Sequence, residues 1–296
     1  MKKKTEQNAA GAPQTGKTAG AGAAGFLKKN WKWLVPVACV AVLGGVWLLK
    51  PKADKPASVD TSYVETTPEQ RDLVNALSGT GASLAGILRG ETFTPRELLY
   101  AALLPSGNEA AMMLGDYVGD GSLDYFAEMM NEKAAELGAV NTHFVNASGM
   151  HDDDHYTTAY DMYLITMAAL ENETFREIVS TNYYYAGEDQ NGNPLHWNTT
   201  NFLISPGSTY YYPYATGVKT GTTDEAGRCL VSTAEKDGYH YLMVMMGAPQ
   251  YDSNGEKLEE NMVFKQTIEL YDWAFSSFSN KTLIEKDVGV GEVPLK

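Results

Sequence analysis

The stretch LLPSGNEAAMM, residues 103–113, places Pro105, Ser106, Gly107 and Asn108 between two segments with the apolar spacing of buried helices. A proline disfavours helical geometry in the residue before it, so the first helix must end here. Ser106 and Asn108 are therefore polar side chains at the mouth of two apolar helices. The question that this stretch raises is what these two side chains face.

The segments around it predict an α+β fold. Capping boxes at Thr67 and Thr94 each open a helix, a third helix follows Ser122, and TTAYDMYLITMAALEN (157–172) is a fourth. Beyond residue 180 the pattern changes to strands, and RCLVSTAEKDGYHYLMVMMG (228–247) reads as a β-hairpin that turns at Asp237-Gly238. A last helix carries Phe264, Ile268, Tyr271 and Phe275 on its core side. Helices, then an antiparallel sheet, then a closing helix indicate α+β.

Charge divides the chain into two parts. Residues 1–55 hold ten Lys and no Arg against Glu6 and Asp54, a net of +8, so that the total of −14 leaves −22 for residues 56–296. A domain that is this acidic repels nucleic acid, and we exclude nucleic-acid binding.

An uncharged apolar run, residues 33–49, follows the basic start and has Trp31, Trp33 and Trp47 near its ends. We interpret it as a transmembrane anchor, because Lys residues concentrate before it and tryptophan favours the membrane interface. A cleaved signal peptide is the alternative. The expected organisation is a disordered cytoplasmic tail (1–32), the anchor (33–49), a linker (50–66) and one extracytoplasmic domain (67–296), at the cell membrane in a single pass.

A second group of polar residues precedes the predicted hairpin, in GVKTGTTDEAGRC (217–229). On a strand, period-two alternation sends Lys219 and Gly221 to one face and Thr220 to the other. A glycine lets a ligand approach the strand closely, and a lysine beside a hydroxyl can polarise a carboxylate or an acyl group.

Together, Ser106-Gly107-Asn108 and Lys219-Thr220-Gly221 resemble two of the three motifs of the penicillin-recognising serine enzymes, Ser-x-x-Lys, Ser-x-Asn and Lys-Thr-Gly. The flanking text, GETFTPRELLYAALLPSGNEAA, ELGAVNTHFVNASGMHDDDHYTTAYDM and VGVGEVPLK, is similar to the D-alanyl-D-alanine carboxypeptidases of peptidase family S11, which are low-molecular-mass penicillin-binding proteins. This resemblance runs from about Thr67 to the C-terminus. It implies a penicillin-binding-protein and β-lactamase-like transpeptidase fold, a helical subdomain plus an antiparallel sheet.

The resemblance also implies a chemistry, serine-type acyl transfer without a cofactor in peptidoglycan processing at the cell wall. In the family, a serine attacks the peptide bond of a stem peptide ending in D-Ala-D-Ala, the motif lysine acts as base, and water releases the acyl-enzyme. By this likeness Ser106 and Asn108 shuttle protons and hold the substrate amide, and Lys219, Thr220, Gly221 and Thr222 bind the terminal carboxylate. β-Lactams are expected ligands by the same resemblance. Ser106 and Asn108 then face a cleft that the Lys219 strand closes.

The sequence departs from the family in its nucleophile motif, because no Lys in the chain has a Ser three residues before it. The resemblance also places two strands and a buried helix upstream of the Ser-x-Asn loop, where this sequence has linker, anchor and tail. We therefore expect a hydrolase-like chain that is inactive alone, a pseudoenzyme. The alternatives are a non-catalytic module that binds the cell wall or a partner protein, and a truncated gene remnant.

Three further expectations follow. Without the missing helix and strands, apolar surface is left bare, so a partner chain or a second copy should cover it. HDDDH (151–155) is interpreted as a solvated loop and not as a metal site, because adjacent loop residues rarely converge on one ion. Cys229, within a strand pattern, is expected to be a small buried hydrophobe.

Overall fold

The computed structural model describes residues 64–65, 77 and 79–278. The apolar run 33–49 and the helix predicted to open at Thr67 lie outside these residues. Among the helices that are described, none is both long enough and apolar enough to cross a membrane. The first described strand, β1 (Val64–Glu65), lies within the segment expected to be linker and pairs with β2 (Thr92–Phe93).

A helical subdomain follows β2. Its members are α4 (Pro95–Leu103), α5 (Asn108–Val118), α6 (Leu123–Glu136), α7 (Ala159–Leu170) and α8 (Glu173–Val179). Thr94 caps α4 with the predicted capping box, and the side chains of Ser122 and Thr158 cap α6 and α7. Gly138, at φ 82°, ends α6 as predicted, because glycine adopts this left-handed conformation without strain. Three predicted helices are thus confirmed, and α8 is one that the pattern did not reveal.

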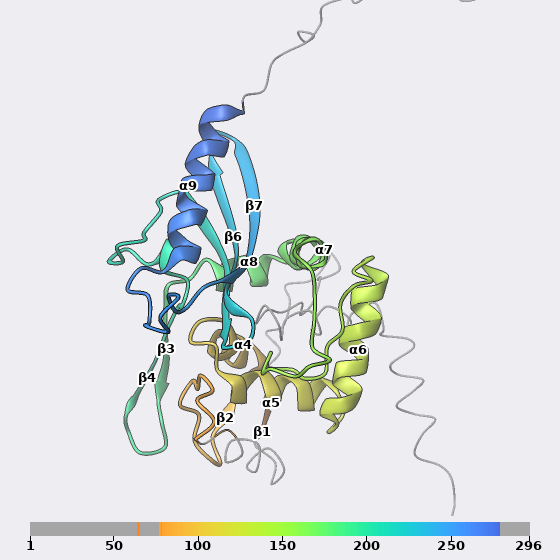
Figure 1. Cartoon of the computed structure of the whole chain (residues 1–296). Helices are drawn as coiled ribbons and strands as arrows, with labels where there is room; N and C mark the ends of the chain where they lie inside the picture. Colours follow the sequence, from red (N-terminus) through yellow and green to blue (C-terminus); the bar gives the residue numbers. More distant parts are fainter. Residues whose placement is uncertain (1–63, 66–76, 78, 279–296) are drawn as a thin grey trace, which may run out of the picture.

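The strands after the helical subdomain form two separate sheets. A hairpin of β3 (Tyr183–Glu188) and β4 (Pro194–Asn198) projects from the helical subdomain, and the 3-10 turn η2 (Phe202–Ile204) follows it (Figure 1). The main sheet has the order β5-β6-β7, with β5 (Ala215–Thr223), β6 (Gly227–Lys236) and β7 (Tyr239–Ala248) all antiparallel. Asp237 and Gly238 both have positive φ at the β6–β7 turn, which confirms the predicted hairpin.

The closing helix α9 (Met262–Ser277) lies along one face of the main sheet, and α7 and α8 contact the other face (Figure 1). Each face has its own apolar core. Alternation along β6 divides its side chains: Leu230 and Ala234 join the core under α9, and Val231 joins the core shared with the helical subdomain. The sheet therefore separates two packed layers, and the face opposite α9 is the one that meets α4 and α5.

Candidate active site

The loop between α4 and α5 is tight and presents Ser106 in an unusual conformation. Ser106 has φ 60°, in the left-handed region that non-glycine residues seldom adopt. The Gly107 N–H donates to the Ala101 carbonyl at 2.9 Å, which closes the turn. Asn108 is the first residue of α5 and not a loop residue as the sequence indicated. A strained residue at such a turn is typical of functional sites.

Gly107 is required by close packing and not by its own φ of −62°. A Cβ at this position would lie 2.7 Å from the Ala85 Cβ and 2.8 Å from the Ala101 carbonyl oxygen. The missing side chain thus lets residues 83–87 lie directly against the loop that carries Ser106 and Asn108.

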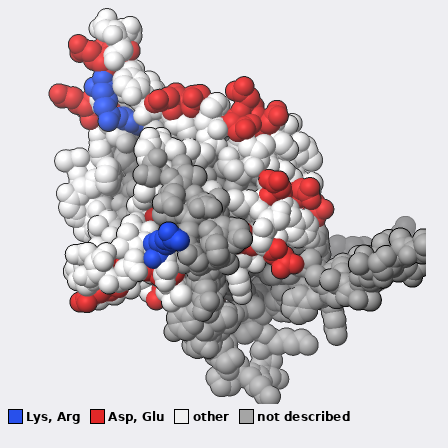
Figure 2. All heavy atoms as spheres, turned by 90° about the horizontal axis from the view of Figure 1, so that it is seen from below, with Lys and Arg blue, Asp and Glu red and all other residues white. Residues whose placement is uncertain are grey.

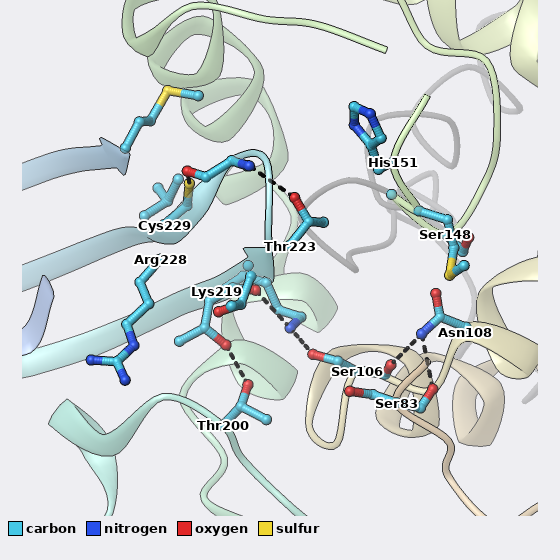
Figure 3. A pocket seen from close by; sticks show the side chains of 18 of the residues that line it. Ser83, Ser106, Asn108, Ser148, His151, Thr200, Lys219, Thr223, Arg228 and Cys229 are labelled. Carbon is cyan, nitrogen blue, oxygen red and sulfur yellow. Dashed lines mark hydrogen bonds between the residues drawn. The ribbon is translucent and has the colours of Figure 1, made fainter. Parts of the chain in front are cut away.

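Lys219 reaches the same place from β5. Its Nζ donates hydrogen bonds to the Ser106 Oγ and to the Thr220 carbonyl oxygen, and the residue is only 6% exposed (Figure 3). Burial lowers the pKa of the Lys219 amine to about 8, because a low-dielectric surrounding disfavours the charged form. At neutral pH the amine is therefore mostly protonated, and it donates its hydrogen bond to the Ser106 hydroxyl as a cation.

The register of the sheet confirms the predicted alternation on β5. Lys219 pairs with Val231 and Val231 pairs with Val244, and this row lies on the sheet face that meets the helical subdomain. Thr220 points the other way, where its hydroxyl lies 2.5 Å from that of Thr200. Thr200 had no signal in the sequence, since its role depends on contact with a strand 20 residues away.

The Asn108 side chain has a fixed orientation. Its Nδ2 donates to the Ser83 carbonyl at 2.9 Å and to the Ser106 carbonyl at 3.4 Å. With both amide hydrogens engaged, the oxygen Oδ1 turns away from these carbonyls and toward the side of the pocket where Ser148 lies (Figure 3). Asn108 therefore offers the site a hydrogen-bond acceptor.

All six residues predicted for the site line one cavity of about 970 Å³. They are Ser106, Asn108, Lys219, Thr220, Gly221 and Thr222. The cavity continues over Val231, Val244 and Met162, so one part of its wall is polar and another is apolar. Its volume lies within the range of small-molecule sites.

Two further segments singled out in the sequence, Cys229 and the HDDDH loop, contribute to the wall of the cavity. Cys229 is partly exposed at the cavity wall, so the expectation of a buried hydrophobe is wrong. His151 and His155 of the HDDDH loop both line the cavity. The His155 Nε2 is buried without a hydrogen-bond partner among the described residues, and burial lowers the pKa of its imidazole. The described residues hold no group of three or more side chains of the kind that binds a metal ion.

The fold is that of the class of penicillin-binding-protein-like DD-transpeptidases. The crystal structure of the Streptomyces K15 DD-transpeptidase matches 82% of this chain and 86% of its own, with a TM-score of 0.63 and 28% identity.

Sequence comparison identifies the family to which the chain belongs. Residues 55–250 match the peptidase S11 family, D-alanyl-D-alanine carboxypeptidase, and the chain belongs to this family. It is 31% identical over 240 residues to D-alanyl-D-alanine carboxypeptidase DacF of Bacillus subtilis and 34% identical over 188 residues to D-alanyl-D-alanine carboxypeptidase of Streptomyces sp. strain K15. The matches span 81% and 60% of this chain, but only 57% and 63% of those relatives.

Proposed function

We propose that the chain recognises the D-Ala-D-Ala end of peptidoglycan stem peptides in this cavity and, alone, binds it without forming an acyl-enzyme. One observation carries the proposal: a buried lysine, a fixed amide oxygen and strand hydroxyls converge on one cleft, and no carboxylate among the described residues pairs with Lys219. A buried cation without an anionic partner is costly, and an incoming carboxylate would supply that partner.

In this proposal the ligand lies along β5. Its terminal carboxylate pairs with the Lys219 amine, and its backbone N–H donates to the Asn108 Oδ1. The rest of the stem peptide runs along the cavity past Gly221, where the absence of a side chain leaves room for it. Binding without acylation is expected because no Ser-x-x-Lys occurs in the sequence. β-Lactams, which carry a similarly placed carboxylate, should bind reversibly for the same reason.

Calorimetry tests recognition, with a synthetic tripeptide ending in D-Ala-D-Ala compared with the same tripeptide ending in L-Ala-L-Ala. We expect heat of binding for the first only, lost in Lys219→Ala. A fluorescent penicillin tests the absence of acylation: a covalent band after denaturing electrophoresis would contradict the proposed inactivity and leave the family chemistry intact.

A second proposal concerns the partner that covers the exposed apolar surface, and the side-chain pattern of β7 favours a second copy of the chain. Strand β7 is one of the two outer strands of the described sheet, yet its side chains pack in both cores. Tyr241, Met243 and Met245 pack in one core, and Leu242 and Val244 pack in the other. Strands that are apolar on both faces are typical of sheet interiors. We propose that another copy of the chain adds its own β7 to this edge. The strand carries no charged side chain between Tyr241 and Ala248, so no charge opposes such edge-to-edge pairing.

The proposed cellular setting is a membrane-anchored protein with this domain outside the cytoplasm. It rests on the apolar run 33–49 and the lysines before it. Protease treatment of intact spheroplasts should remove the domain and leave a small membrane-bound fragment. Protection of the domain, or its release from membranes by high salt, would contradict the proposal. The gene-remnant alternative predicts instead that the purified chain shows no cooperative thermal unfolding.

A further inference from the structure

A buried carboxylate stands directly beside the site residues and takes no part in the chemistry proposed above. Glu109 follows Asn108 on α5, and only 1% of its surface is exposed. Its Oε1 accepts the backbone N–H of Ala85 at 2.6 Å, of Gly86 at 3.0 Å and of Ile87 at 3.5 Å. One carboxylate oxygen thus holds three consecutive N–H groups of a segment more than twenty residues away.

The other carboxylate oxygen of Glu109 makes this arrangement unfavourable for folding stability. Oε2 is buried and has no hydrogen-bond partner among the described residues, and burial raises the pKa of the Glu109 carboxyl. A half-satisfied buried carboxyl reduces stability relative to an apolar side chain of similar size. Residues that lower stability in this way tend to belong to functional sites, where stability is given up for geometry.

The segment that Glu109 holds, residues 83–87, is the one that orients Asn108. The Ser83 carbonyl accepts both the backbone N–H and the Nδ2 of Asn108, each at 2.9 Å. The Ala85 carbonyl accepts the Trp197 indole N–H at 2.8 Å. The segment has no helix or strand of its own, so these side-chain contacts and the close approach to Gly107 fix its position.

We propose that Glu109 is a positioning residue: by holding residues 83–87 against the start of α5, it fixes the Ser83 carbonyl and through it the orientation of the Asn108 amide. Without Glu109, three N–H groups lose their acceptor and the segment can move off α5. The Asn108 amide then loses its main partner and can rotate, so that its oxygen no longer faces the cavity. This proposal rests on the proposed function only for its effect on ligand binding.

Two Glu109 variants and one control test it in the full chain. Glu109→Gln keeps an oxygen acceptor at Oε1, whereas Glu109→Ala removes it. Asp161→Ala is the matched control, because Asp161 is an equally buried carboxylate that holds a different segment, accepting from the Asn141 N–H at 2.7 Å and the Thr142 hydroxyl at 2.8 Å. It does not line the cavity.

The first readout is the pair of Asn108 side-chain amide signals in a ¹⁵N–¹H correlation spectrum of the free protein, identified by their loss in Asn108→Asp. We expect these signals to shift and broaden in Glu109→Ala, and to remain near their wild-type positions in Glu109→Gln and Asp161→Ala. The second readout is the dissociation constant of the D-Ala-D-Ala tripeptide, which should rise at least about tenfold in Glu109→Ala and less than about threefold in the other two.

The two readouts separate two kinds of failure. If wild-type protein binds no tripeptide, the proposed function is wrong, and the amide signals still decide the role of Glu109. If a folded Glu109→Ala protein keeps the wild-type Asn108 signals, or if Asp161→Ala shifts them equally, Glu109 has only a general structural role and the positioning proposal is overturned.

Discussion

Lys219 is the residue whose burial has the clearest energetic consequence. A pKa that falls from 10.5 in the unfolded chain to about 8 in the folded one means that the folded state binds fewer protons between these values. Stability therefore rises as pH increases through that window. Below pH 8 the buried charge destabilises the protein by about 3 kcal/mol, at about 1.4 kcal/mol for each pH unit.

Replacing Lys219 with Met should therefore stabilise the protein at pH 7, by up to about 3 kcal/mol, because an apolar side chain needs no hydration in this position. The gain should shrink between pH 8 and 10.5 as the wild-type lysine loses its proton. Urea unfolding at pH 7 and pH 10 measures both values, with the exposed Lys257→Met as control. A Lys219→Met protein that is less stable than wild type at pH 7 would show that the hydrogen bond to Ser106 outweighs the desolvation of the charge.

The same titration governs ligand binding. Only the protonated Lys219 attracts a carboxylate, so the affinity for a D-Ala-D-Ala peptide should be constant below about pH 8 and fall above it, approaching tenfold per pH unit. A bound carboxylate raises the pKa of the lysine in the complex, which moves the lower plateau to still higher pH. Calorimetric titrations from pH 6 to pH 10 measure this profile. An affinity that increases above pH 8 would place the carboxylate away from Lys219.

Motif residues could be read from the sequence, but their supports could not. Ser106, Asn108 and Lys219 belong to short, recognisable sequence motifs. Ser83 and Glu109 do not, because their roles arise from contacts between segments more than twenty residues apart. Cys229 was misjudged because a strand pattern shows which residues alternate, but not which face borders a cavity.

At the scale of elements, local signals sufficed where the determinants are local. The Thr94, Ser122 and Thr158 caps lie within three residues of the N–H groups that they satisfy, so the starts of α4, α6 and α7 were predictable. The seven-residue helix α8 was not, because so short a helix depends on the packing of Phe175 and Ile178 in the core and not on propensity.

The junction of α4 and α5 gives a prediction at this scale. Gly107 is the N-cap of α5, where alanine is not favoured over glycine, and the Cβ of Gly107→Ala would overlap Ala85 and the Ala101 carbonyl. We expect a loss of about 1–3 kcal/mol, typical of overpacking, together with weaker peptide binding because residues 83–87 are displaced. Thermal unfolding and calorimetry measure the two effects. Gly207→Ala is the control, since a Cβ there meets nothing within 4 Å; equal behaviour of the two variants would contradict the packing argument.

At the scale of the whole molecule, the class α+β followed from the order of helical and strand patterns, but the order of strands in the sheet did not. Strand order depends on contacts between distant segments, and periodicity within one strand does not report it. The apolar pattern of β7 on both faces is the exception, because it indicates a strand with neighbours on both sides, whereas the described sheet gives it only β6. The surface supports the charge argument, since acidic side chains are scattered over the face in Figure 2 and basic ones are few.

Within the described part of the chain β7 has only β6 as a strand neighbour, and this arrangement leads to the prediction for the assembly. If two copies pair through β7, the chain should sediment as a dimer whose fraction rises with protein concentration. Met246, 45% exposed on β7, is the place to introduce a charge, because a lysine on an edge strand blocks pairing with another strand. Met246→Lys should therefore shift the equilibrium to the monomer by at least about tenfold without lowering the melting temperature. Tyr183→Lys, at a 47% exposed position on the separate β3–β4 hairpin, should leave the dimer unchanged. Sedimentation velocity of the detergent-solubilised full chain compares the three proteins, and a wild-type monomer at all concentrations, or equal loss of the dimer in both variants, would remove β7 as the interface.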